Sequence, residues 1–174
     1  MSERLHRPET FAPDAETQKD FRNALGRFGT GVTVITCMTD EGPLGITANS
    51  FASLSLDPPL VLWSPGKFSR RYGAFTAAQH FAIHVAGADQ LPLCEGFAKD
   101  AEFFHSVEWA ENDRGVPVLD GWLARFECDK VAQHDGGDHA IVVGRVTRVQ
   151  TRPGAPLVFF EGRYGSFEDP QDGA

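Results

Sequence analysis

The chain has 174 residues, a hydrophobic content of 41% and a formal net charge of -8. A chain of this length suits one domain, and its apolar content is close to that of globular proteins. The acidic balance argues against a nucleic-acid surface, which needs a basic stripe, and against an anionic membrane surface. No apolar run approaches the roughly 20 residues of a spanning helix, so the sequence also predicts no transmembrane segment.

The two ends of the chain set the expected limits of the domain. Residues 1–16 are polar and contain prolines, which predicts a flexible arm, and the acidic residues 168–174 predict a frayed tail. The domain is therefore expected over residues 17–167. The beginning of the chain lacks the apolar core of a signal peptide, so we expect a cytoplasmic protein. The three widely spaced cysteines predict buried thiols rather than a disulfide framework or a zinc site; they are Cys37, Cys94 and Cys128.

Apolar periodicity predicts a few helices and a larger number of strands. Apolar residues at helical spacing predict a helix over residues 17–27; they are Phe21, Ala24, Leu25 and Phe28. Further helices are expected after a loop at residues 64–69, up to about residue 76, and over residues 88–97. Strands are expected over residues 32–38, 44–57, 60–63, 81–85, 122–131, 140–150, 157–160 and 164–167. Turn residues predict hairpins at 40–43 and 134–138, and residues 99–115 predict a loop. Many strands joined by hairpins, with few helices, favour an antiparallel β-barrel or sandwich.

The stretch from residue 44 to residue 59 alternates between two faces and predicts a strand that is buried on one side. The first face is mainly apolar and consists of Ile46, Ala48, Ser50, Ala52, Leu54 and Leu56. The second face carries mainly short hydrogen-bonding side chains, at Thr47, Asn49, Ser53, Ser55 and Asp57. Such groups can bind a polar ligand without filling its space. The plain alternative is a half-exposed strand with small polar residues.

A cluster of cations lies where the second helix is expected to begin. Lys67, Arg70 and Arg71 supply three positive charges there, and Ser69 adds a hydroxyl. The unpaired N–H groups of a first helical turn and the helix dipole favour an anion, so this segment predicts a phosphate site. The alternative is that Ser69 is an ordinary N-cap and that the cations form a solvated face.

Three further positions could face a ligand. Thr30 lies between two glycines, where a planar ligand could approach the backbone closely, although a turn residue would look the same. His139 could hydrogen-bond to a ligand or stack beside it through its imidazole ring, or it could be an exposed turn histidine. Tyr164 could simply pack. A metal site at residues 134–139 is a weaker alternative, because two glycines interrupt its histidine and aspartate residues.

Five short motifs follow one another along the chain: Phe-Gly-Thr-Gly-Val (28–32), Gly-x-Thr-Ala-Asn-Ser-Phe (45–51), Ser-Leu-Asp-Pro-Pro (55–59), Gly-Asp-His (137–139) and Gly-Arg-Tyr (162–164). In this order they resemble the short-chain flavin reductase family, the reductase components of two-component flavin-dependent monooxygenases. The resemblance covers roughly residues 20–167. It implies an FMN-binding split barrel, which is an antiparallel Greek-key β-barrel with a few flanking helices, and usually a homodimer.

The resemblance also implies roles for single residues. Flavin contacts are implied at Thr30, Thr47, Ala48, Asn49 and Ser50. The segment that lines the isoalloxazine ring is implied at Ser53, Ser55, Leu56 and Asp57. Lys67 and Ser69 are implied as phosphate ligands, and His139 as the catalytic residue on the nicotinamide side, with Tyr164 near the cofactor. Trp63 departs from the family, where a smaller residue is common, and is expected to reshape the pocket.

The implied activity is transfer of a hydride from NADH or NADPH to N5 of FMN or FAD, followed by release of the reduced flavin to a partner monooxygenase. This chemistry needs no covalent nucleophile, because the protein's task is to hold two rings at near-contact distance. Two alternatives from other classes stay open. One is a non-enzymatic flavin-binding electron carrier of the same fold, and the other is a metal-dependent enzyme that uses residues 134–139. The sequence leaves open which flavin and which nicotinamide nucleotide are used.

Overall fold

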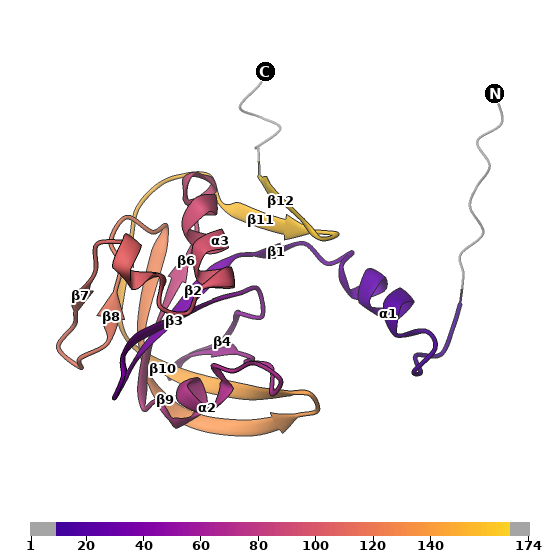
Figure 1. Cartoon of the computed structure of the whole chain (residues 1–174), viewed down its shortest axis with the longest axis horizontal. Helices are drawn as coiled ribbons and strands as arrows, with labels where there is room; N and C mark the ends of the chain where they lie inside the picture. Colours follow the sequence, from indigo (N-terminus) through magenta and orange to yellow (C-terminus); the bar gives the residue numbers. More distant parts are fainter. Residues whose placement is uncertain (1–9, 168–174) are drawn as a thin grey trace, which may run out of the picture.

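The computed structural model describes residues 10–167, and strands dominate this part of the chain. Seven strands form one antiparallel sheet in the order β3-β2-β6-β9-β10-β5-β4 (Figure 1). Their bounds are β2 (Thr33–Thr39), β3 (Gly42–Ala48), β4 (Ala52–Leu56), β5 (Pro59–Trp63), β6 (His80–Val85), β9 (Ala124–Gly136) and β10 (His139–Thr151). The predicted class, mainly β and antiparallel, is confirmed.

Smaller sheets and five short helices complete the described chain. A three-stranded sheet consists of β1 (Thr30–Gly31), β11 (Leu157–Phe160) and β12 (Arg163–Ser166), and a two-stranded sheet of β7 (Ala110–Glu111) and β8 (Pro117–Val118). The helices are α1 (Gln18–Leu25), α2 (Tyr72–Ala77), α3 (Leu91–Lys99) and the 3₁₀ helices η1 (Ala88–Gln90) and η2 (Phe103–Ser106). The predicted loop over residues 99–115 therefore contains η2 and β7. Part of the predicted N-terminal arm, residues 1–9, and the whole predicted tail, residues 168–174, lie outside the described residues.

The prediction of one strand over residues 44–57 is wrong, because this stretch splits into β3 and β4 around residues 49–51. β3 pairs with β2 and β4 pairs with β5, so the two halves lie at opposite ends of the seven-stranded sheet. The Ser50 hydroxyl fixes the break, since it accepts a hydrogen bond from the Ser64 N–H at 3.0 Å and donates one to the Ser64 carbonyl at 3.2 Å. Leu54 and Leu56 are 50% and 97% exposed, so the predicted apolar face ends with β3.

The sheet is curved, because only three residues join its two outermost strands, β3 and β4. In a flat sheet with strands about 4.8 Å apart, these two strands would lie roughly 29 Å from each other, farther than three residues can span. A core cluster lies on the inner side of the sheet, and each strand from β2 to β5 in the sheet order contributes to it. This inner cluster consists of Ile35, Cys37, Val61, Trp63, Phe75, Phe81, Ile83, Cys128 and Val142.

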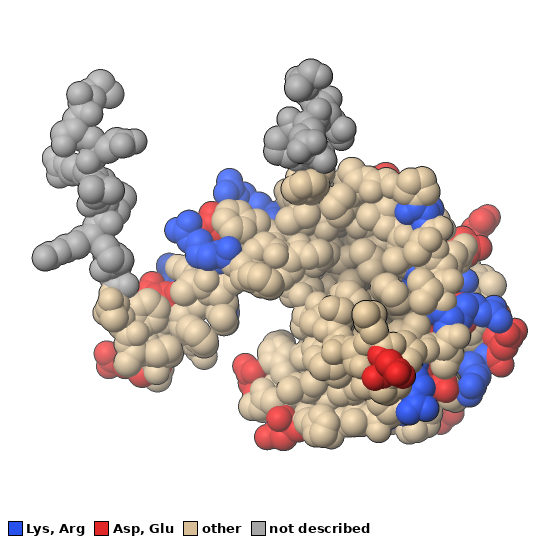
Figure 2. Space-filling view, turned by 180° about the vertical axis from the view of Figure 1, so that it is seen from behind, with Lys and Arg blue, Asp and Glu red and all other residues tan. Residues whose placement is uncertain are grey.

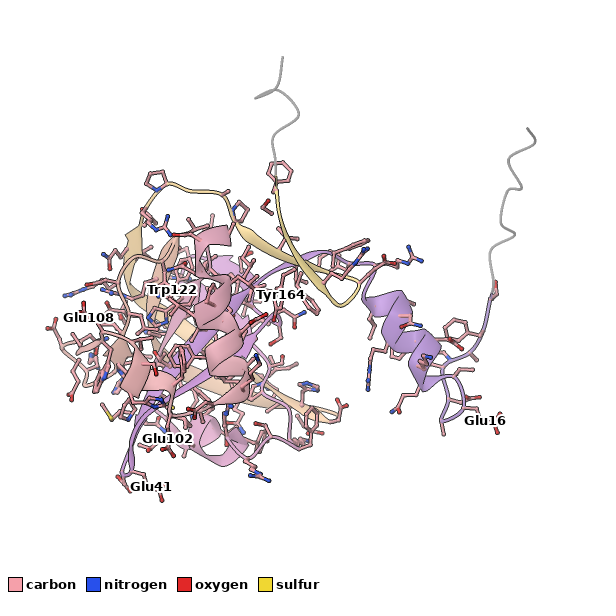
Figure 3. The ribbon with its side chains drawn as sticks, turned by 45° about the horizontal axis from the view of Figure 1, so that its top comes forward. Glu16, Glu41, Glu102, Glu108, Trp122 and Tyr164 are labelled. Atoms are coloured by element: carbon pink, nitrogen blue, oxygen red, sulfur yellow. The ribbon has the colours of Figure 1, made fainter. Side chains whose placement is uncertain are left out.

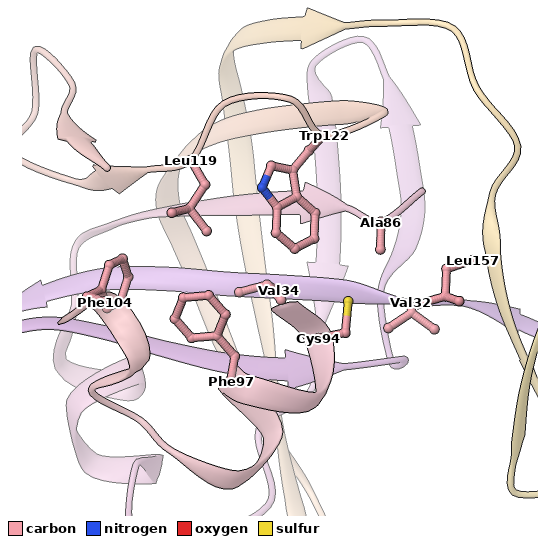
Figure 4. Packing of buried hydrophobic residues seen from close by; sticks show 9 residues of the cluster. All are labelled: Val32, Val34, Ala86, Cys94, Phe97, Phe104, Leu119, Trp122 and Leu157. Carbon is pink, nitrogen blue, oxygen red and sulfur yellow. The ribbon is translucent and has the colours of Figure 1, made fainter. Parts of the chain in front are cut away.

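A second cluster covers the other side of β2, where α3 packs (Figures 1 and 4). It consists of Val32, Val34, Ala86, Cys94, Phe97, Phe104, Leu119, Trp122 and Leu157. The ring of Phe97 is in edge contact with that of Phe104, with centroids 5.1 Å apart. The three cysteines are free and buried, as predicted. This cluster anchors α3 beside the end of β3, where several of the predicted flavin contacts lie.

The predicted helix over residues 17–27 is confirmed as α1, which stands apart from the sheets (Figure 1). None of its residues is buried, and the apolar residues Phe21, Leu25 and Phe28 are 42%, 59% and 77% exposed. From behind, a broad notch separates α1 from the body (Figure 2). The apolar face that predicted the helix therefore has no cover among residues 10–167. Within the same residues, no helix combines the length and apolar content that crossing a bilayer requires.

The hairpin of β9 and β10 is longer than predicted. His134 and Asp135 belong to β9, and the turn is reduced to Gly137 and Asp138. Gly137 has a φ of 77°, in the left-handed region that a two-residue hairpin turn needs. His139 is therefore the first residue of β10, paired with Gly136 at the tip of the hairpin.

Candidate functional site

The loop at residues 64–69 lies against the tip of the β9–β10 hairpin. The Lys67 N–H donates to the Asp138 carbonyl at 2.8 Å, and the Ala140 N–H donates to the Pro65 carbonyl at 3.1 Å. Gly66 forms an antiparallel bridge with His139. The fold thus brings together the predicted phosphate segment and the predicted nicotinamide-side histidine, which are far apart in sequence.

His139 is held in a defined orientation at this tip. Its Nδ1 lies 2.7 Å from the Oδ1 of Asp138, and the pair lowers the pKa of the Asp138 carboxyl. Because a carboxylate can only accept a hydrogen bond, Nδ1 carries the proton and the opposite nitrogen, Nε2, is left for a ligand. The ring of Phe68 meets the imidazole edge-on, with centroids 5.8 Å apart. Phe68 is 81% exposed, and the sequence analysis assigned it no role.

Lys67 has a partner that was not predicted from the sequence. Its ammonium forms an ion pair with the carboxylate of Asp135 in β9. The pair raises the pKa of Lys67 and lowers that of Asp135. The signal that could have found it is the hairpin itself, because a long β9 carries residue 135 to the same tip as His139.

The expectation that the phosphate segment lies at the start of a helix is wrong in detail. α2 begins at Tyr72, with Arg71 at its N-cap, so Ser69 is not the cap and lies in the preceding turn. The Ser69 hydroxyl accepts a hydrogen bond from the Arg71 N–H at 3.2 Å. A phosphate at Lys67 and Ser69 would therefore meet a loop rather than the end of a helix dipole.

Arg71, which the sequence grouped with the cations of a phosphate site, is engaged elsewhere. Its Nη1 donates to the carbonyls of Gly45 at 3.0 Å and Phe97 at 2.6 Å. The second of these carbonyls belongs to the last turn of α3, where backbone acceptors lack helical partners. Arg71 therefore ties α2 to β3 and α3, and Lys67 is left as the cation of the docked loop.

A cavity of about 150 Å³ lies beside the end of β3, and Tyr164 of β12 faces it (Figure 3). Its lining includes three of the implied flavin contacts; the full lining is Val32, Thr47, Ala48, Asn49, Ala98, Phe159 and Tyr164. The Thr47 hydroxyl donates to the Cys94 carbonyl at 2.6 Å, which fixes the strand against α3. A cavity of this volume suits part of a ligand, since sites for whole small molecules span about 300–1,000 Å³.

Tyr164 is placed in this cavity by strand pairing. It lies opposite Phe159 in the β11–β12 hairpin, and their ring centroids are 5.2 Å apart. Burial raises the pKa of the Tyr164 hydroxyl. Phe159 was missed from the sequence, although a hairpin between the two predicted C-terminal strands would have paired it with Tyr164.

Thr30 is placed near this cavity by its own strand. It pairs with Phe159 through β1, and its buried hydroxyl has no hydrogen-bond partner within residues 10–167. A buried hydroxyl without a partner is unfavourable, so a ligand acceptor or donor there would satisfy it.

The remaining implied ligands lie on β4 and the turn after it, at Ser53, Ser55, Leu56 and Asp57. Ser55 is half-buried and the others are exposed. None of these four residues lines the cavity beside Tyr164.

Two further expectations concern pocket shape and metals. Trp63 does not reshape the pocket, because it is 1% exposed and packs in the inner core against Phe75, with ring centroids 5.2 Å apart. Over residues 10–167, no group of three or more histidine, cysteine, aspartate or glutamate residues lies close enough to hold a metal ion. A wider cavity of about 640 Å³ lies between the β2–β3 hairpin and the end of α3, and it contains none of the implied site residues.

Comparison with known proteins identifies the family of the chain. The sequence profile described as "Flavin reductase like domain" matches residues 25–168. The chain is 57% identical over 157 residues to the FMN reductase (NADH) SmoA of Agrobacterium fabrum, covering 90% of each chain. It is 40% identical to the flavin-dependent monooxygenase reductase subunit HsaB of Rhodococcus jostii, covering 90% of this chain and 82% of that one.

A solved structure is also closely similar. The NADH:FAD oxidoreductase SgcE6 of Streptomyces globisporus C-1027 superimposes with a TM-score of 0.85 at 35% identity, covering 93% of this chain and 100% of that one. The resemblance read from the five motifs is thereby confirmed, and this chain belongs to the family of flavin reductase like domains.

Proposed function

We propose that this protein is an NADH-dependent flavin reductase that transfers a hydride from NADH to FMN or FAD and supplies the reduced flavin to a flavin-dependent monooxygenase. The observation that carries the proposal is the docking of the Lys67 loop on the hairpin tip beside His139. The relatives' names, which include an FMN reductase (NADH) and a monooxygenase reductase subunit, support the donor, the acceptor class and the partner.

The fit of a flavin follows from the chemistry of the residues present. Lys67 offers a positive charge to a phosphate, and the hydroxyl of Ser69 lies in the same loop. Thr30, whose buried hydroxyl has no partner in the described part of the chain, and Asn49 at the end of β3 offer hydrogen bonds to a polar ring edge. When bound, the flavin supplies the two-electron chemistry, because its ring accepts a hydride.

The protein's own residues then hold and orient the two partners of the reaction. The Asp138 carboxylate keeps the proton of His139 on Nδ1, so that Nε2 would be available to contact the donor's ring. Tyr164 and Phe159 form an aromatic wall next to Thr47 and Ala48. Holding both rings close together converts a bimolecular encounter into an effectively unimolecular step, which can supply much of the acceleration.

We further propose that the domain of residues 17–167, which is built on the curved sheet, is a Greek-key split barrel. Only three residues separate β3 from β4, so the two edges of the sheet cannot lie more than about 14 Å apart at that point. A curved sheet whose two edges approach without pairing is the geometry that the term describes. The implied isoalloxazine segment on β4 would then face the gap between the two edges.

A homodimer is part of the proposal. Leu56 is 97% exposed on β4, and the apolar face of α1 is uncovered within residues 10–167. Exposed apolar surfaces of this kind mark sites of association. A second copy that covers β4 would also exclude water from the implied isoalloxazine segment.

We also propose a cytoplasmic location. Its support is the state of Cys37, Cys94 and Cys128, which are buried free thiols. Burial raises the pKa of each thiol to about 12, so the reactive thiolate is scarce. Proteins of oxidising compartments more often pair their cysteines in disulfides.

The activity is tested by mixing the purified protein with NADH and with FMN or FAD, and by following NADH oxidation in the absence of any oxygenase. We expect turnover with at least one flavin, and a loss of about 100-fold in kcat for His139→Ala if its contact with the donor assists the step. Asp113→Asn, on an exposed side chain outside the site, should leave the rate unchanged. If neither flavin supports NADH oxidation and flavin stays bound through purification, the protein is instead a non-enzymatic electron carrier.

A further inference from the structure

The ammonium of Lys67 is already engaged. Its partner, the Asp135 carboxylate, has a side chain that is 77% exposed, and the Lys67 side chain is 38% exposed. The pair lowers the pKa of Asp135 and raises that of Lys67. Both groups therefore stay charged near neutral pH. Any anion that Lys67 binds must share the ammonium with this carboxylate or displace it.

The backbone keeps the two partners at this place. Lys67 is fixed to the hairpin tip by its N–H, which donates to Asp138, and Asp135 is paired in register with Ala140. Since both backbones are held by strand or bridge hydrogen bonds, only rotation of the two side chains can open the ion pair. The carboxylate therefore stays within reach of the ammonium when a ligand arrives.

The charge around Lys67 is acidic overall. Asp135 and Asp138 carry two negative charges, and with neutral histidines the sum over these two residues and Lys67 is one negative charge. The other cations of the segment contact other groups. Arg71 is engaged by backbone carbonyls, and Arg70 lines the wider cavity next to Asp40, Glu41, Asp100 and Glu102.

We propose that Asp135 competes with the flavin phosphate for Lys67, and that it thereby lowers the affinity for phosphorylated flavins without affecting the isoalloxazine ring. The inference rests on the proposed flavin binding and adds a residue that sets how firmly the phosphate end is held. A phosphate that must displace a carboxylate is bound less tightly than one that meets a free ammonium. Weak retention suits a protein whose reduced flavin has to leave for a partner.

The test is the affinity of two ligands that differ only in the phosphate, FMN and riboflavin, measured by the change in flavin fluorescence. Asp135→Asn removes the negative charge and keeps the shape of the side chain. We expect it to bind FMN about three- to fivefold tighter, a size typical of exposed charge pairs, and to bind riboflavin as the wild type does. In a Lys67→Ala background the same change should have a smaller effect on FMN, because the contested cation is gone.

Asp113→Asn is the matched control. It removes the same charge from an exposed aspartate, whose partner Arg148 lies nine positions along β10 from His139, or about 30 Å at the rise of a strand. This variant should leave the ratio of FMN to riboflavin affinity unchanged. Added salt should shrink the gain of Asp135→Asn, because exposed charges are screened.

The possible outcomes distinguish a failure of this inference from a failure of the proposed function. If Asp135→Asn binds FMN more weakly, Asp135 positions Lys67 for the phosphate, and the inference is overturned. An equal change for FMN and riboflavin, or an equal gain in Asp113→Asn, also overturns it. If the wild type binds neither flavin, the proposed function fails as well. If the wild type reduces flavin but Asp135→Asn leaves the ratio of FMN to riboflavin affinity unchanged, this inference alone fails.

Discussion

At the scale of single residues, His84 is held by hydrogen bonds at both nitrogens of its ring. It is fully buried, its Nδ1 lies 3.1 Å from the Val34 carbonyl, and the Leu119 N–H donates to its Nε2 at 3.1 Å. One nitrogen must donate and the other must accept, which defines the neutral imidazole with its proton on Nδ1. The pKa of His84 is lowered from 6.5 to about 3, mainly by burial; the hydrogen bond to Val34 opposes this shift and the charge of Arg125 adds to it.

The stability of the protein should therefore depend on His84 in mild acid. Above pH 6.5 the histidine is neutral in both states, and below it the unfolded chain binds a proton that the folded chain does not. The free energy of unfolding should fall as the pH decreases from about 6.5 towards 3, by on the order of 5 kcal/mol over the whole interval.

Urea unfolding of the wild type and of His84→Gln at several pH values between about 7 and 5 checks this expectation. Glutamine does not titrate, so the stability of the variant should decline less over this range, although it is less stable at neutral pH. Other titrating groups are common to both proteins and cancel in the comparison. Parallel pH profiles would show that His84 is not the group responsible.

Single residues of the site were predicted unequally well. Lys67 and His139 were identified from their chemistry and their local motifs, and the structure brings their loop and their strand together. Asp135 and Phe68 were not assigned these roles, because each acts through a neighbour that is distant in sequence. A contact between residues far apart in the chain has no local signal to reveal it.

At the scale of elements, the contact between β3 and α3 leaves no room for a side chain at Gly45. A Cβ at this position would lie 2.4 Å from the Cδ1 of Phe97 and 3.3 Å from the Cε2 of Phe104. Both rings are buried in the cluster that holds α3. The Gly45 carbonyl also accepts the hydrogen bond from Arg71. Glycine is thus required here by close approach rather than by its backbone angles.

Gly45→Ala should force α3 away from β3. Overpacking of this kind destabilises proteins by about 1–3 kcal/mol, and the shift would also strain the hydrogen bond between Thr47 and Cys94 at the cavity. We expect a lower denaturation midpoint and weaker flavin binding. The control is Gly165→Ala in β12, where a Cβ would meet no atom within 4 Å. If both variants unfold at the same denaturant concentration, the contact with Phe97 does not limit the packing of α3.

The elements themselves were largely predictable, except where the chain breaks. Hydrophobic alternation identified β6, β11 and most of β9 and β10, and turn residues identified the β2–β3 hairpin. The division between β3 and β4 could not be read, because the alternation continues across residues 49–51. Pairing with two different strands separates the halves, and pairing partners are a property of the whole sheet.

At the scale of the whole molecule, α1 has an apolar face that nothing within residues 10–167 covers. Phe21 and Leu25 lie on its apolar face, and Lys19 lies on the opposite face of the helix. A helix of eight residues is marginal in water unless its apolar face packs against something. A second copy of the chain is the proposed cover.

Replacing Phe21 and Leu25 together by aspartate should convert the proposed homodimer into a monomer, as measured by light scattering coupled to size exclusion. The physical reason is the burial of two carboxylates in an apolar contact, which is strongly unfavourable. Lys19→Asp is the matched control, because it adds negative charge to α1 without altering the apolar face. A wild type that is monomeric, or a double variant that stays dimeric, would rule out α1 as the contact.

The sequence by itself determined the family, the antiparallel β class, the buried cysteines and the residue types that a phosphorylated aromatic cofactor needs, because these depend on local composition, periodicity and short motifs. The tertiary structure alone decided that the Lys67 loop meets His139, that Asp135 holds Lys67, and that the predicted strand over residues 44–57 divides between the two edges of the sheet. Each of these depends on which strands pair and how the sheet curves. Such long-range choices minimise the energy of the whole chain, so no single stretch of sequence records them.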